Sequence, residues 1–137
     1  MVKQVVWLEL RSDEAGDGQF GARRGERTHR GVDVVCQPDA MVLAPVAGVI
    51  TRWGYAYADD LAWRYVEITE SDGDRHRLFY VDPDYAVIGD FVSLDDPIGD
   101  AQDITEKYPD QDMTPHIHYE VKNAQGQYID PTEWAIG

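Results

Sequence analysis

Two short clusters of potential metal ligands lie far apart in the sequence. His29 and Asp33 are separated by three residues, and His116 and His118 follow much later with one residue between them. In a β-strand, side chains at positions i and i+2 point to the same face with backbone origins ~6.6 Å apart, so the two later histidines can face one small volume. Imidazoles and a carboxylate, with a fourth tetrahedral position left for water, form a ligand set that zinc takes in catalytic sites, whereas structural sites more often use cysteines. The sequence therefore predicts a site for one zinc ion.

Chance offers a simpler explanation, because the chain contains four histidines among 137 residues and two of them can fall close together without function. Both clusters, however, adjoin predicted strands. The first leads into Val32–Cys36, and the second opens the run His116–Val121. Their position at strands favours the metal site over coincidence.

Three segments occur in an order that resembles the lysostaphin/LytM-type zinc endopeptidases, which cut peptide cross-links in bacterial cell walls. The segments are Arg27–Cys36, Val42–Ile50 and Pro115–Val121, and the resemblance extends from about Gly18 to Pro131. Within that superfamily the chain is most similar to the leukocyte cell-derived chemotaxins, a branch that is regarded as non-catalytic. The segments that carry this second resemblance are Gly18–Phe20, His29–Cys36, Phe79–Pro83 and Lys107–Pro109.

The resemblance implies roles for individual residues. His29, Asp33 and His118 would bind the zinc ion, and His116 would lie beside it as a general acid or base. Active members of the family usually carry a further histidine in a Tyr-x-His motif at the end of a middle strand. The matching stretch here begins at Tyr80 and places Asp82 where that second catalytic imidazole is expected.

Asp82 changes the chemistry that the resemblance implies. Histidine has an ordinary pKa of ~6.5 and can donate or accept a proton at neutral pH. An aspartate with an ordinary pKa of ~3.9 is ionised there and can only accept. Loss of one acid–base partner typically lowers the rate ~10²–10⁴-fold and leaves metal binding intact. Two hypotheses therefore stay open: a zinc endopeptidase in which Asp82 has an altered supporting role, and an inactive zinc-stabilised module that recognises a peptide or glycan. Asp82 could also simply belong to a turn after a strand.

Length and composition predict one compact domain that spans residues 1–137, and the resemblance implies that this domain is zinc-peptidase-like. Asp and Glu number 26 against 12 Lys and Arg, a net charge of −14. This charge disfavours nucleic acid and anionic membranes as partners. The resemblance implies a peptide of peptidoglycan, or another peptide or glycan, as the ligand. A single cysteine, Cys36, excludes an intramolecular disulfide and predicts a small buried side chain next to the site.

The chain shows neither a signal peptide nor a transmembrane segment, so we expect access to a cell wall to need a phage particle, a secretion system or lysis.

Most of the chain has β-type patterning, in which short β-branched and aromatic runs are separated by Gly, Pro and Asp. Helical turns are expected only around Ile104–Tyr108 and Thr132–Ala135. The fold class predicted is all-β, with twisted antiparallel sheets that form a groove. The expected strands are Val2–Leu10, Val32–Cys36, Val42–Trp53, Arg64–Thr69, Arg75–Val81, Phe91–Leu94, His116–Lys122 and Tyr128–Ile129.

Three further residues are predicted to contact a substrate in the groove. Trp53 belongs to an aromatic-rich stretch, Arg52–Tyr65, that could overhang the groove or simply pack across the strands of a hairpin. Arg23 could approach the groove from upstream of the metal motif or form a surface ion pair, and Tyr80 begins the altered Tyr-x-Asp motif. His76 is expected to be a surface histidine.

Overall fold

The structure is a computed structural model of the 137-residue chain that describes residues 30–132 and Trp134, together with the backbone of four two-residue strands nearer the N-terminus. These short strands form two small antiparallel pairs, β1 with β2 and β3 with β4. Their bounds are Ser12–Asp13 (β1), Gly16–Asp17 (β2), Arg23–Arg24 (β3) and Arg27–Thr28 (β4).

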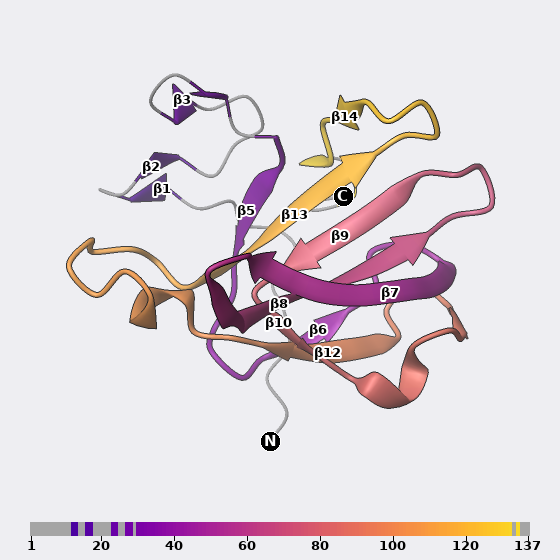
Figure 1. The fold of residues 1–137 in the computed structure, drawn as a ribbon, viewed down its shortest axis with the longest axis horizontal. Coiled ribbons are helices and arrows are strands. Elements are labelled where there is room, and N and C mark those ends of the chain that lie inside the picture. Colours follow the sequence, from indigo (N-terminus) through magenta and orange to yellow (C-terminus); the bar gives the residue numbers. More distant parts are fainter. Residues whose placement is uncertain are drawn as a thin grey trace.

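A seven-stranded antiparallel sheet forms the main body of the described chain (Figure 1). Its strands follow the order β11-β7-β8-β9-β13-β14, and β5 pairs with β13 in addition. The long β7–β8 hairpin curls across the centre of the molecule beside β9. The strand bounds are Val32–Val35 (β5), Gly48–Tyr57 (β7), Asp60–Thr69 (β8), Arg75–Phe79 (β9), Phe91–Val92 (β11), His116–Lys122 (β13) and Tyr128–Ile129 (β14).

A second, three-stranded antiparallel sheet has the order β10-β12-β6. Its bounds are Met41–Leu43 (β6), Val81–Pro83 (β10) and Pro97–Ala101 (β12). Two short 3₁₀ turns, Tyr85–Val87 (η1) and Ile104–Glu106 (η2), complete the regular structure in residues 30–130. The predicted all-β fold class with little helix is therefore confirmed.

The hydrophobic core lies between the two sheets. The large sheet contributes fully buried aliphatic side chains such as Ile68, Leu78 and Ile117, and the small sheet contributes Val81 and Ile98. Alternation along each strand sends every second residue of β13 into this core. The intervening residues of β13, His116 among them, project from the opposite face.

The predicted strand pattern differs from the structure at two breaks. The expected strand Val42–Trp53 is divided into β6 and β7, because the Ala44–Ala47 segment with its proline turns the chain from one sheet to the other. The expected strand Arg75–Val81 ends at Phe79, because Tyr80 adopts a left-handed conformation with φ 68°. Strand β12 was not predicted, and the expected strand Val2–Leu10 lies outside the described residues.

The helical turn expected at Ile104–Tyr108 is present as the shorter η2. Of the turn expected at Thr132–Ala135, Thr132 and Trp134 have helical backbone and the other two residues lie outside the described part. The aromatic stretch Arg52–Tyr65 forms the ends of β7 and β8 and the turn between them, as the hairpin interpretation predicted.

A close backbone approach positions β5, the strand that carries the predicted ligand Asp33. A Cβ atom on Gly31 would lie 2.2 Å from the carbonyl oxygen of Tyr119, so only glycine allows the chain to enter β5 this close to β13. The pairing that follows places Asp33 directly opposite His118. Across the other edge of β13, Phe79 is the partner of His118.

Candidate metal centre

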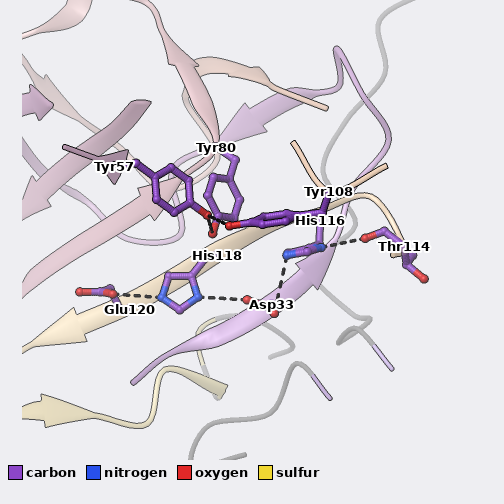
Figure 2. Close-up of polar contacts among 8 residues, drawn as sticks. All are labelled: Asp33, Tyr57, Tyr80, Tyr108, Thr114, His116, His118 and Glu120. Carbon is purple, nitrogen blue, oxygen red and sulfur yellow. Dashed lines mark hydrogen bonds and ion pairs between the residues drawn. The ribbon is translucent and has the colours of Figure 1, made fainter. Parts of the chain in front are cut away.

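Asp33 lies between two histidines of β13 (Figure 2). Its Oδ1 atom is 3.0 Å from Nδ1 of His118, and its Oδ2 atom is 3.6 Å from Nε2 of His116. Asp33 and His116 are each only 4% exposed. Strand pairing and side-chain alternation therefore bring one carboxylate and two imidazoles together on one face of the sheet.

Glu120 contacts the opposite side of the His118 ring, with Oε1 3.0 Å from Nε2. Burial alone lowers the pKa of His118, but the hydrogen bonds to Asp33 and Glu120 outweigh this effect and raise the pKa to about 9. Sequence reasoning missed Glu120, although it is two residues beyond His118 on a strand and shares its face. The two-residue spacing between His118 and Glu120 could have predicted that both side chains lie on the same face.

The donor atoms fit a zinc ion chemically. Zinc binds imidazole nitrogen and carboxylate oxygen at ~2.0–2.2 Å, so two tetrahedral ligands lie about 3.4 Å apart. The 3.0 Å between Asp33 Oδ1 and His118 Nδ1 is close to that separation. His29, the remaining predicted ligand, lies outside the described residues.

His116 is oriented by the loop that precedes β13. Its Nδ1 atom is 2.7 Å from the carbonyl oxygen of Thr114, which can only accept, so Nδ1 carries the proton and donates it. Nε2 is then the nitrogen that can exchange a proton, and it faces Asp33. The ring of Tyr80 packs edge-on against His116 with 5.8 Å between ring centroids.

Three tyrosine hydroxyls meet beside the histidines (Figure 2). Tyr108 donates to the Tyr57 hydroxyl over 3.1 Å, and the Tyr57 and Tyr80 hydroxyls are 3.0 Å apart. Burial, together with the neighbouring phenols, raises the pKa of Tyr57 far above its ordinary value. Tyr57 therefore remains protonated and can donate a hydrogen bond. Tyr57 and Tyr108 come from distant segments, and nothing in their local sequence predicted this meeting.

Asp82 and Trp53 belong to a different group of side chains. Because Val81 is buried in the core, alternation along β10 directs Asp82 to the exposed face. Its carboxylate accepts a hydrogen bond from Arg64 over 3.3 Å, and the Arg64 guanidinium lies 5.8 Å from the centroid of the Trp53 ring. Asp82 therefore contacts Arg64 at the exposed end of this group. Arg23 lies in β3, and its side chain is outside the described part of the chain.

Two other side chains singled out in the sequence are buried. Cys36 is 3% exposed, and burial raises the pKa of its thiol to about 12, which leaves it unreactive at neutral pH. His76 was predicted to be on the surface, and this prediction is wrong. It is fully buried and bonds to the hydroxyl of Tyr119 and the carboxylate of Glu70, because its strand position faces the core.

An acidic cluster at the β8–β9 turn could bind a metal ion. Carboxylate oxygens of Glu70, Asp72 and Asp74 lie within 4.8 Å of one another. In the described part of the chain, no helix is long and apolar enough to cross a membrane.

Comparison with known proteins identifies relatives over most of the chain. The family model described as "Peptidase family M23" matches residues 27–131. Leukocyte cell-derived chemotaxin-2 from Bos taurus is 28% identical over 113 residues, which cover 82% of this chain and 72% of the relative. The Mus musculus protein of the same name is 34% identical over 76 residues, or 55% of this chain and 50% of the relative.

Solved structures of lysostaphin from Staphylococcus simulans have the same fold. The longer form superposes with a TM-score of 0.65 and 20% identity over 85% of this chain and 47% of its own. Its catalytic domain alone gives 0.64 and 20% over 89% of this chain and 90% of the domain. The chain therefore spans about half of the longer lysostaphin chain and nearly all of the catalytic domain.

Proposed function

Because the chain belongs to peptidase family M23, we propose that it binds one zinc ion through His29, Asp33 and His118 and cuts peptide cross-links of peptidoglycan as a metalloendopeptidase. The observation that carries this proposal is the Asp33 carboxylate held between the imidazoles of His116 and His118. Buried ion-pairing groups that converge in this way are expensive to assemble unless they serve a ligand or a reaction.

The residues around the site have separable roles in such a reaction. When bound, zinc supplies Lewis acidity that polarises a scissile carbonyl and lowers the pKa of water to about 7. His116 moves the proton, because its Nδ1–H is fixed on the Thr114 carbonyl and its Nε2 points into the site. The Tyr80 ring keeps this imidazole in place from one side.

The substrate is proposed from the family and from the groups beside the site. Neutral phenols such as Tyr57 can donate to the carbonyl groups of a peptide. Trp53, in contact with Tyr55 and Tyr85, offers an aromatic surface on the same β7–β8 hairpin, and Arg23 is a further candidate contact. The net charge of −14 makes nucleic acid and anionic membranes poor partners.

A second candidate function is an inactive zinc-stabilised module that recognises a peptide or glycan. The Asp82–Arg64 contact favours it, since Asp82 stands where the second catalytic imidazole is expected and its carboxylate accepts a hydrogen bond from a guanidinium there. The chemotaxin-2 relatives point the same way, because the chemotaxin branch is regarded as non-catalytic. Asp33 and His118 would then serve fold stability through the metal.

One experiment separates these functions. Zinc content is measured first, and release of cross-linked muropeptides is then assayed for the native chain, His116→Ala and Asp82→His. Turnover by the native chain that disappears in zinc-loaded His116→Ala supports the peptidase. Zinc binding without turnover, with activity gained in Asp82→His, supports the recognition module. A native chain that binds no zinc contradicts both.

A further inference from the structure

We propose that Glu120 is a positioning residue that sets the orientation and tautomer of the zinc ligand His118. The inference rests on the proposed zinc site and extends it to a residue that sequence reasoning had left out. Its geometric basis is the 3.0 Å contact between Glu120 Oε1 and His118 Nε2, on the side of the ring away from Asp33. Figure 2 shows the ring aligned between the two carboxylates.

The tautomer of His118 decides which nitrogen is available to a metal. A neutral imidazole has one N–H and one lone pair, and a carboxylate can only accept a hydrogen bond. In the neutral ring that a metal needs, Glu120 would therefore keep the proton on Nε2 and leave Nδ1, on the side of Asp33, as the nitrogen available to the metal. Carboxylates in this position behind a metal-bound histidine orient the ring and increase its basicity.

The strands β9 and β8 place charged residues in register with Glu120. Arg77 stands directly opposite Glu120 across the β9–β13 pair, and Glu67 stands opposite Arg77 across β8–β9. Arg77 Nε donates to Glu67 Oε2 over 2.8 Å, and Thr51 donates to Glu67 Oε1 over 2.6 Å. Arg77 therefore stands between Glu67 and Glu120 in a row of alternating charge across three strands.

A competing explanation is that Glu120 acts only through its negative charge, which would attract any cation. Two nearly isosteric neutral variants separate the explanations. Gln at position 120 can still accept a normal hydrogen bond from His118 Nε2–H, whereas the thioether of Met is only a weak acceptor. Both remove the same charge. Positioning predicts that the two variants differ, and a pure charge effect predicts that they agree.

The test measures zinc affinity of the full chain by competition with a chromophoric chelator. We expect Glu120→Met to bind zinc about 10–100-fold more weakly than the native chain, with Glu120→Gln retaining most of the affinity. Nitrogen NMR of the metal-free proteins, at a pH where His118 is neutral, should report an Nε2–H tautomer for His118 in the native chain and in Glu120→Gln. Glu106→Gln and Glu106→Met, at an exposed acidic position in η2, form the matched control pair.

Equal zinc affinities for Glu120→Gln and Glu120→Met would overturn the positioning role and leave the zinc site intact. A native chain without measurable zinc affinity would overturn the proposed site and this inference together, and it is recognised before any variant is made. Thermal unfolding of the metal-free variants identifies a folding defect, and in that case the NMR tautomer of Glu120→Gln decides. An Nδ1–H tautomer there contradicts the inference.

Discussion

Two aspartates of this chain lie in opposite settings, Asp33 in a buried cluster and Asp82 on an exposed face. Asp33 is 4% exposed, lies in the seven-stranded sheet and contacts two histidines. The Asp82 side chain is 55% exposed, lies in the three-stranded sheet and contacts Arg64. Strand register places both residues, but it directs Asp33 into a buried cluster with two histidines and Asp82 onto an exposed face where it meets Arg64.

This contrast separates metal binding from its catalytic support. The pairing of β5 with β13 positions Asp33 and His118 through backbone hydrogen bonds, so their geometry is part of the fold. Support for proton transfer depends instead on the loops that precede β13 and follow β9. A chain can therefore keep the metal site while the supporting residues change, and each prediction below tests one side of this division.

The largest effect is expected at Asp33. Asp33→Ala removes a proposed zinc ligand that contacts both histidines, so zinc affinity should fall by more than the ~100-fold loss that a change beyond the direct ligands causes. Chelator competition measures this loss, with metal-free thermal unfolding as the control. Zinc affinity within tenfold of the native value would contradict the assignment of Asp33.

His116→Ala should leave zinc affinity close to the native value and, if the chain is a peptidase, lower turnover about 10²–10⁴-fold. The reason is that Nε2 of His116 is positioned to exchange a proton while His118 faces Asp33 through Nδ1. Muropeptide release and zinc content measured on the same preparation test this. Loss of turnover together with loss of bound zinc would place His116 among the metal ligands.

The ion pair between Glu67 and Arg77 should make stability depend on pH. Burial raises the pKa of Glu67, but hydrogen bonds from Thr51 and Arg77 outweigh burial and lower it below its ordinary value of 4.5. Because the folded pKa is lower, the contribution is present above pH 4.5 and is lost as the pH falls through the folded value.

Glu67→Gln should therefore cost about 1.5–3 kcal/mol near neutral pH, the range for hydrogen bonds to charged groups. The difference from the native chain should shrink in acid. Urea unfolding of both proteins between neutral and acidic pH measures this, and a constant difference would show that the charge of Glu67 does not matter.

The smallest effect is expected at Asp82. Asp82→Asn weakens an exposed ion pair with Arg64, so stability should change by no more than about 1 kcal/mol and zinc affinity should stay unchanged. Urea unfolding and chelator competition provide the comparison. A large fall in zinc affinity would mean that Asp82 belongs with Asp33 after all.

Much of the candidate metal centre could be predicted from the sequence because it follows from side-chain alternation along strands. Alternation along a strand predicts that His116 and His118 share one face. The same alternation puts Glu120 on that face, although Glu120 was not among the predicted site residues. Cys36 was correctly predicted to be buried. The positive φ of Tyr80, which ends β9, has no signal in a tyrosine side chain.

The remaining features depend on contacts between distant segments. Tyr57 and Tyr108 are 51 residues apart, and their hydroxyls meet only because the β7–β8 hairpin and the loop before β13 come together. His76 is buried because its side of β9 faces the core, and its polar atoms find Tyr119 and Glu70 there. Neither meeting can be derived from local sequence, since each depends on how the completed sheets pack.

A crystal structure of the full chain grown with zinc, with anomalous scattering recorded at the zinc absorption edge, tests the central claim most directly. The account predicts one strong anomalous peak from a zinc ion that is bound by His29, Asp33 Oδ1 and His118 Nδ1. The Glu120 carboxylate should still contact Nε2 of His118. A peak elsewhere, such as at the Glu70 turn, or no peak with these side chains pointing apart, would contradict it.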